Sequence, residues 1–339
     1  MKSKPTVQKI LIVRMSSMGD VIHQWPAVTD LARAYPEGVI DWVVEEGFAE
    51  LPRLHPAIRR VIPVALRRWR KSLLATQTHR EWQAFKTELL ACRYDLVLDA
   101  QGLIKSAAIA KMACGPVAGF DRHSIREPLA SLAYCRTYPV SKALHAIERN
   151  RQLSAAALGY RAEGEIDYGL RMSDQMADQV ANRPALSWLP DSPYVVCLTA
   201  TSRADKEWPE AHWIVLGQKL LARGIRPVFP WGSTAERERA ERLSAALPAA
   251  IVAPRLSLTD AAILLAGSTM VVGVDTGLVH LAAAVAVPTI AIFCASDPAL
   301  TGIRASSYAV NLGQRGAAPG VEAVWDAMLA GWPAGSNTP

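Results

Sequence analysis

Short apolar runs alternate with amphipathic segments along the first half of the chain. Apolar and β-branched residues predict strands over residues 9–15, 39–44 and 95–99, and helical spacing predicts helices from about residue 20 to 35 and over 103–112. Strands that are apolar nearly throughout and separated by helices are typical of a parallel sheet covered on both faces. The first half is therefore expected to form a Rossmann-like α/β domain.

The same alternation is more regular in the second half. Apolar runs predict strands over residues 194–199, 226–230, 250–253, 270–274 and 289–293. Amphipathic spacing predicts helices over residues 212–222, 234–247, 258–266, 277–285 and 321–329. Glycine after a helix and Asp, Ser or Thr before one are the expected stop and start signals. A second doubly wound parallel sheet is expected.

The length of the chain, 339 residues, suits two domains of ordinary size. The proline-rich polar stretch over residues 159–193 is the expected connection. We predict an N-terminal domain over residues 1–180, a C-terminal domain over 181–318 and a helix over 319–333 that packs at their junction. Two such domains facing each other would place ligands at the carboxyl ends of both sheets, in the cleft between them.

Composition indicates a globular protein that works in a reducing compartment. Hydrophobic residues make up 50% of the chain and charged residues 20%, which argues against disorder. The 5 cysteines lie far apart, which argues against a disulfide framework and a zinc site. The apolar run at residues 10–13 is too short for a secretory signal. Residues 270–294 contain Asp275, His280 and Pro288, so strand–helix–strand is expected there instead of a membrane span.

The positive charge is confined to the first half. Lys and Arg outnumber Asp and Glu by 25 to 19 in residues 1–180 and equal them, 12 to 12, in residues 181–339, which accounts for the net charge of +6. This asymmetry favours an anionic partner: a membrane surface, a phosphorylated glycolipid or nucleic acid. A solvated basic face with no partner is the plainer alternative.

The segment Ser-Ser-Met-Gly-Asp, which ends at Asp20, directly follows the first predicted strand. It is neither a GxGxxG nor a Walker loop, so dinucleotide and P-loop sites have little support. Gly19 permits a tight turn, and Asp20 stands where a helix begins. Asp20 is either a helix N-cap or a carboxylate that is exposed at a strand's carboxyl end and acts as a base.

Residues 274–280 follow a buried strand and open an apolar helix. Backbone N–H groups from Thr276 and Gly277 onward, together with the helix dipole, predict an anion site. His280 lies one turn further on and is either a donor to a phosphate or ribose or a satisfied core histidine.

Two further segments carry candidate ligands for anions. Thr201, Ser202 and Lys206 lie in a loop after a strand and suit the oxygens of a diphosphate, although a solvated loop is the alternative. The run from Arg67 to Lys71 places four cations around one tryptophan and suits a phosphorylated lipid headgroup or nucleic acid.

The sequence contains no Asp-x-Asp pair and no cluster of His and Cys. A diphosphate bound here would then be neutralised by Lys206, hydroxyl groups and a helix N-terminus, without a metal ion.

Taken together, these segments resemble one known family. They are ILIVRMSSMGDVIHQWPAVTDL, DWVVEEGFAELP, RVIPVALRRWRK, DLVLDAQGLIKSA, REPLASLAY, ATSRADKEWPEAHW and VVGVDTGLVHLAAA. In this order, from about residue 8 to 300, they resemble the heptosyltransferases of the ninth glycosyltransferase family, particularly those that add the first heptose of the lipopolysaccharide inner core.

The resemblance implies a GT-B fold, an ADP-L-glycero-D-manno-heptose donor, Kdo2-lipid A as acceptor, and an inverting reaction that needs no metal or cofactor. It makes Asp20 the catalytic base. The implied donor-binding residues are Thr201, Ser202, Lys206, Glu236, Leu256, Asp275, Thr276, Gly277 and His280. The implied acceptor-binding residues are Arg67, Arg68, Arg70, Lys71 and Arg126. Ser202 and Leu256 replace the family's usual threonine and methionine and keep a hydroxyl and an apolar wall.

The implied workplace is the cytoplasmic face of the inner membrane, where the basic half would meet anionic lipid. Three alternatives stay open at this point: a transferase that adds a later heptose or uses another nucleotide sugar, a nucleotide-sugar binding or epimerase-like protein, and a nucleic-acid binder. The epimerase would require GxGxxG after the first strand, and the resemblance implies no nucleic-acid partner.

Overall fold

The computed structural model describes residues 9–170, 183–190, 192–201, 203–305 and 307–333. It divides into two compact units, Met1–Gly169 and Leu170–Pro339.

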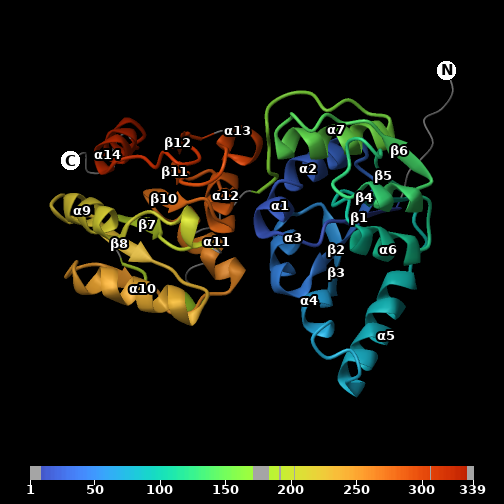
Figure 1. Cartoon of the computed structure of the whole chain (residues 1–339), viewed down its shortest axis with the longest axis horizontal. Helices are drawn as coiled ribbons and strands as arrows, with labels where there is room; N and C mark the ends of the chain where they lie inside the picture. Colours follow the sequence, from blue (N-terminus) through green and yellow to red (C-terminus); the bar gives the residue numbers. More distant parts are fainter. Residues whose placement is uncertain (1–8, 171–182, 191, 202, 306, 334–339) are drawn as a thin grey trace. The chain divides into compact units, whose positions relative to one another are not determined.

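The first unit contains a six-stranded parallel sheet with the strand order β3-β2-β1-β4-β5-β6 (Figure 1). Its strands are β1 (Lys9–Val13), β2 (Val39–Glu45), β3 (Ile58–Val64), β4 (Leu96–Asp99), β5 (Val117–Phe120) and β6 (Arg136–Tyr138). Its α-helices are α1 (Met18–Ile22), α2 (Trp25–Ala34), α3 (Glu50–Leu54), α4 (Leu66–Trp69), α5 (Thr76–Leu90), α6 (Ile104–Met112) and α7 (Ala146–Leu158), with 3-10 turns η1 (Glu46–Phe48) and η2 (Pro128–Ala133).

Helices cover both faces of this sheet, as the apolar strands predict. On one face, Leu11 and Val13 of β1 share a core with Phe85 of α5 and Ile109 of α6. On the other face, α2 and α7 pack side by side. Residues 10 to 13 of β1 are fully buried, which explains why this central strand has no polar residue after the exposed Lys9 at its start.

The second unit repeats the same topology, with the strand order β12-β11-β10-β7-β8-β9 and every pair parallel. Its strands are β7 (Tyr194–Leu198), β8 (Arg226–Phe229), β9 (Ile251–Val252), β10 (Met270–Val274), β11 (Thr289–Ile292) and β12 (Ala309–Leu312). Its helices are α9 (Glu210–Leu221), α10 (Thr234–Ala245), α11 (Leu258–Ala266), α12 (Gly277–Ala284), α13 (Pro298–Thr301) and α14 (Val321–Ala330), with 3-10 turns η4 (Pro184–Leu186) and η5 (Ala204–Lys206).

The last helix, α14, contributes Val324, Trp325 and Met328 to the core of the second unit, where it packs against α9, β11 and β12. Its predicted role at a domain junction is not addressed by these contacts and stays a prediction. The predicted domain boundary at residue 180 lies outside the described residues, and the boundary between the two compact units falls after Gly169.

The predicted pair of doubly wound parallel sheets is confirmed. The helical segment expected from residue 20 to 35 is two helices, because Pro26 has no N–H to donate and α2 starts afresh at Trp25 with this proline in its first turn. Residues 270–294 form β10, α12 and β11, as expected. No helix in the described part of the chain is both long and apolar enough to span a bilayer.

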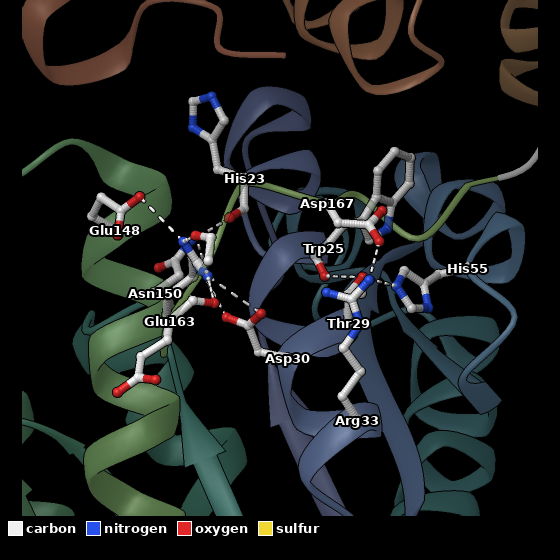
Figure 2. A network of polar contacts seen from close by, with 12 residues as sticks. His23, Trp25, Thr29, Asp30, Arg33, His55, Glu148, Asn150, Glu163 and Asp167 are labelled. Atoms are coloured by element: carbon white, nitrogen blue, oxygen red, sulfur yellow. Dashed lines mark hydrogen bonds and ion pairs between the residues drawn. The ribbon is translucent and has the colours of Figure 1, made fainter. Parts of the chain in front are cut away.

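A network of polar contacts ties the end of the first unit to α2 and α7 (Figure 2). Arg151 of α7 is 3% exposed, and it pairs with Asp30 of α2 at 2.7 Å and donates to the carbonyl groups of Glu163 and Gly164. Arg33 pairs with Asp167. Because a buried cation is stable only when it is paired, Arg151 fixes both the packing of α2 on α7 and the path of the chain after α7.

Candidate functional site

Two residues, Asp20 and Gln101, follow the central strands of the first sheet. Asp20 lies in α1, which begins after the loop that follows β1, and Gln101 lies in the loop after β4, the neighbouring strand. The chain continues from β1 to one side of the sheet and from β4 to the other side. This is the switch point at which open α/β sheets bind ligands beyond the carboxyl ends of their strands.

Asp20 is the third residue of α1 and not its N-cap, which is Ser17. One carboxylate oxygen, Oδ1, accepts from Arg14 Nη2 at 2.9 Å, and the other, Oδ2, accepts from the Ser17 amide at 2.9 Å and its hydroxyl at 3.0 Å. A carboxylate has about four lone-pair sites. One of them therefore stays open on a side chain that is 33% exposed.

The surroundings of Asp20 keep it ionised. Burial tends to raise the pKa of its carboxyl group, but the Arg14 guanidinium, the hydrogen bonds from Ser17 and the charge of Arg126 together lower it below its usual value. Asp20 is therefore an anion at neutral pH that can accept a proton. The contribution of Arg126 also places this predicted acceptor residue within electrostatic range of Asp20.

Contacts with the ends of the neighbouring strands fix the loop between β1 and α1, which positions Asp20. The Met15 amide donates to Gln101 Oε1 at 2.7 Å, the Glu45 amide donates to the Met15 carbonyl at 3.1 Å, and Arg14 donates to the Ala100 carbonyl. Arg14 and Gln101 were not predicted as site residues. Their positions at the ends of the strands β1 and β4 could have indicated that they belong to the site.

Gln101 is held in turn by Asp99, the last residue of β4. The Asp99 carboxylate is fully buried and accepts hydrogen bonds from the amides of Gln101 and Gly102, from the Ser106 hydroxyl and from the Tyr134 hydroxyl. Burial raises the pKa of this carboxyl, and the hydrogen bonds offset that only in part. Asp99 thus fixes the turn after β4 by contacts that no local sequence pattern reveals.

The predicted acceptor residues of the first unit differ in whether their side chains already have partners within that unit. Arg68 pairs with Glu46 at 2.9 Å and with Glu81 at 2.8 Å. The Arg67 guanidinium lies 5.4 Å from the Phe48 ring centroid. Arg70, Lys71 and Arg126 are exposed, and the described part of the chain holds no ion pair with any of them.

In the second unit, the candidate donor residues gather at one edge of the sheet. Thr201 and Lys206 follow β7, Glu236 follows β8, Leu256 follows β9, and residues 275 to 280 follow β10. These four strands are parallel neighbours. Their carboxyl ends therefore meet at the same edge, and β7 and β10 form the switch point.

Asp275 is the centre of this group. Its Oδ2 atom accepts from Lys206 Nζ at 2.6 Å and from Ser296 Oγ at 2.5 Å, while Thr201 Oγ1 donates to its carbonyl at 3.0 Å. His280 Nε2 lies 3.9 Å from its Oδ1 atom. Burial tends to raise the pKa of Asp275, but His280, Lys206 and Ser296 lower it well below its usual range. A fixed anion therefore orients the predicted phosphate ligands Lys206 and His280. Ser296, after β11, was not predicted.

Thr276 is the N-cap of α12, and Gly277 is its first residue. The first amides of a helix have no partner inside that helix, and the positive end of the dipole lies beside them. The side chain of Thr276 makes no capping bond, and the residue is half-buried. This end of α12 has the chemistry of an anion site next to Lys206.

The remaining predicted donor residues lie on the β8 and β9 side of the edge. Glu236 is the third residue of α10, and its Oε2 atom accepts from the Gly232 amide at 2.7 Å. Leu256 is half-buried between β9 and α11. The Trp231 indole donates to the Ala253 carbonyl at 2.6 Å, which joins these two loops. Ser202 lies outside the described residues.

Within the described ranges, no group of three or more His, Cys, Asp or Glu side chains could hold a metal ion. All of the cysteines are free thiols.

Several known proteins are similar to this chain in sequence and in fold. The family model for glycosyltransferase family 9 (heptosyltransferase) matches residues 82–326. Lipopolysaccharide heptosyltransferase 1 of Pseudomonas aeruginosa is 52% identical over 307 residues, covering 90% of this chain and 83% of that protein.

Solved structures of the Escherichia coli heptosyltransferase WaaC share the fold. The structure with ADP has a TM-score of 0.86 at 43% identity and covers 94% of this chain and 98% of that one. The structure with ADP-2-deoxy-2-fluoro heptose has a TM-score of 0.82 at 42% identity, with the same coverage. The expected GT-B fold and the expected enzyme class are confirmed, and the chain belongs to glycosyltransferase family 9, the heptosyltransferases.

Proposed function

We propose that this enzyme transfers L-glycero-D-manno-heptose from ADP-heptose to a Kdo hydroxyl of Kdo2-lipid A, with inversion at the anomeric carbon and without a metal ion. The choice of donor is supported by the ADP and ADP-2-deoxy-2-fluoro heptose in the WaaC structures, and transfer to lipopolysaccharide by the 52% identical lipopolysaccharide heptosyltransferase 1. Kdo as the acceptor sugar rests on the family resemblance. The chemistry is carried by one observation: the Asp20 carboxylate, held by Arg14 and Ser17, keeps one open lone pair at a switch point.

In the proposed reaction, Asp20 accepts the proton of the acceptor hydroxyl while that oxygen forms a bond to the anomeric carbon. The bond from this carbon to the β-phosphate oxygen breaks on the opposite face, and ADP leaves with the electron pair. One displacement inverts the anomeric configuration, as in single-step inverting glycosidases. General base catalysis of this kind contributes about 10²–10⁴-fold.

Lys206 and the start of α12 suit the charge that develops on the departing diphosphate. The Lys206 ammonium has three N–H donors and gives one to Asp275, which leaves two for phosphate oxygens. Preorganised donors of this kind stabilise a transition state without reorganising. Asp275 itself repels a phosphate, so its proposed role is to hold Lys206, Thr201 and His280 in place. Glu236 would accept hydrogen bonds from the ribose, and Leu256 would line the adenine pocket.

The acceptor is proposed to meet the basic residues of the first unit. Arg70, Lys71 and Arg126 are exposed cations and can pair with phosphate or carboxylate groups at low cost. Arg68 is expected to contribute less to acceptor binding, because Glu46 and Glu81 already occupy its guanidinium. Arg67 stands between these cases, since its backbone amide is held by Glu45 while its side chain stays exposed.

The test is a transfer assay with ADP-heptose and Kdo2-lipid A in the presence of a chelator, with the anomeric configuration of the product read by NMR. Asp20→Asn is expected to lower kcat at least about 10²-fold and to leave ADP affinity nearly unchanged. Glu37→Gln, which removes an exposed carboxylate elsewhere in the same unit, is the matched control and should retain kcat.

Three results would refute parts of the proposal. Normal turnover by Asp20→Asn removes this residue as the base, a retained configuration removes the single displacement, and loss of activity with chelator removes metal independence. Faster turnover on an already heptosylated core than on Kdo2-lipid A would instead favour a later step of core assembly.

A further inference from the structure

Two leucines stand on the loop between α4 and α5, where the first unit ends in a narrow tip (Figure 1). Leu73 is 71% exposed and Leu74 is 101% exposed. The Ala75 amide donates to the Ser72 carbonyl at 3.1 Å, which closes a turn with the two leucines at its central positions. Gly, Pro, Asn, Asp and Ser are the usual residues of such turns. Leucine at both positions needs an explanation outside the turn itself.

The base below this tip is firmly packed. Trp69 is 6% exposed, its indole donates to Glu81 Oε2 at 2.6 Å, and its ring contacts Trp82 and Phe85 at centroid distances of 5.7 and 6.0 Å. The Ser72 and Thr78 hydroxyls lie 3.3 Å apart and close the turn from the other side. Leu73 and Leu74 take part in none of these contacts. Their side chains are therefore exposed on a turn whose flanking residues are well packed.

Cations without ion pairs in the described ranges lie close in sequence to the two leucines. Arg70 and Lys71 precede them, Arg80 follows one turn into α5, and all three are exposed with no ion pair in the described ranges. The acidic residue closest in sequence, Glu81, is already engaged by Arg68 and Trp69. Two exposed apolar side chains flanked in sequence by free cations suit a bilayer with anionic headgroups, since leucines can enter the acyl boundary while cations pair with phosphates.

We propose that Leu73 and Leu74 form a membrane-insertion turn that binds the protein to the surface of an anionic bilayer. The leucines supply the apolar contact, and Arg70, Lys71 and Arg80 supply the electrostatic contact. This binding requires neither donor nor acceptor, so its test is independent of the transfer reaction.

The experiment is sedimentation of the full chain with vesicles of phosphatidylcholine, alone or mixed with an equal amount of phosphatidylglycerol. The unaltered protein is expected to bind the mixed vesicles and to bind neutral ones at least about tenfold less. Leu73→Ser/Leu74→Ser is expected to lower binding to mixed vesicles at least about tenfold, because two partly inserted leucines are lost.

The matched control is Leu129→Ser/Leu132→Ser on η2, which removes leucines that are 68% and 82% exposed at another place in the same unit. This control should bind mixed vesicles within about twofold of the unaltered protein. Equal losses in both double variants, or no binding by the unaltered protein, would overturn the proposal. So would full binding by Leu73→Ser/Leu74→Ser.

A gain-of-function variant separates insertion from damage to the fold. Leu74→Trp places an aromatic ring that favours the membrane interface at the tip. It is expected to bind mixed vesicles at least as tightly as the unaltered protein and to add an emission component that shifts to the blue when vesicles are present. An added component that does not shift would show that the turn stays in water, and the proposal would fall.

Discussion

Protonation of His55 should destabilise the first unit in mild acid. His55 is 2% exposed, and its Nδ1 atom accepts from the Ala57 amide at 3.2 Å. Its Nε2 atom lies 3.0 Å from Thr29 Oγ1, which itself donates to the Trp25 carbonyl at 3.3 Å (Figure 2). The neutral ring with its proton on Nε2 satisfies this chain of bonds. A second proton would point an N–H group at the Ala57 N–H group.

The size of the effect follows from the pKa of His55. Burial lowers this pKa from 6.5 to about 4, and Asp167 offsets the shift only in part. The unfolded chain therefore binds more protons than the folded chain between these values, so stability falls as the pH falls through this window. At about 1.36 kcal/mol per pKa unit, the loss from this residue between pH 7 and pH 5 is about 2 kcal/mol.

The assay is urea unfolding at pH 7 and pH 5, with amide exchange of α2 as a local probe, for the unaltered protein and for His55→Gln. Glutamine keeps a donor for Thr29 and does not titrate, so the variant should lose about 2 kcal/mol less between the two pH values. An NMR titration should show no protonation of His55 above about pH 5. Equal losses in both proteins, or a His55 pKa near its ordinary value, would refute the argument.

Three further predictions concern the proposed reaction. Arg14→Met removes a cation that lowers the pKa of Asp20, so the acid limb of the profile of kcat/KM against pH should move to higher pH. Arg14→Lys keeps the charge and should move the limb less. An unmoved limb in both variants would exclude this electrostatic role of Arg14. Gln101→Ala removes the acceptor of the Met15 amide, so it should lower kcat about tenfold or more with little change in the KM for the donor. A change in KM alone would contradict the role of Gln101 in positioning Asp20. Lys206→Ala should weaken binding of ADP and slow the chemical step, measured by calorimetry and single-turnover kinetics, and unchanged ADP affinity would remove Lys206 from the diphosphate site.

Much of the fold could be predicted, because buried parallel strands read as continuous apolar runs. The strand predicted over residues 270–274 coincides with β10. Shorter or more polar elements were missed: β5 has four residues with a glycine, β6 reads Arg-Thr-Tyr, and β12 is only partly buried. The long helix α5 was also missed, because it is polar overall and buries only Thr78, Phe85 and Leu89.

The candidate site was predictable only as separate loops. Position after a strand identified Asp20, Lys206 and Asp275, since parallel strands place their following loops at one edge. That Lys206 bonds Asp275, 69 residues away, depends on β7 lying beside β10. Such pairing follows from strand order, which local patterns do not specify.

The repeated strand order of the two sheets has a consequence for how such enzymes diversify. In each unit the buried strands form the frame, and the candidate ligand contacts lie on loops beyond the strand ends. Because the proposed donor ligands lie on the loops after β7 to β10, substitutions there are expected to alter the choice of nucleotide sugar while the hydrophobic frame and Asp20 stay intact. Under the proposed function, such changes would leave the proposed base and acceptor residues of the first unit unchanged, so the donor and the acceptor could be selected separately.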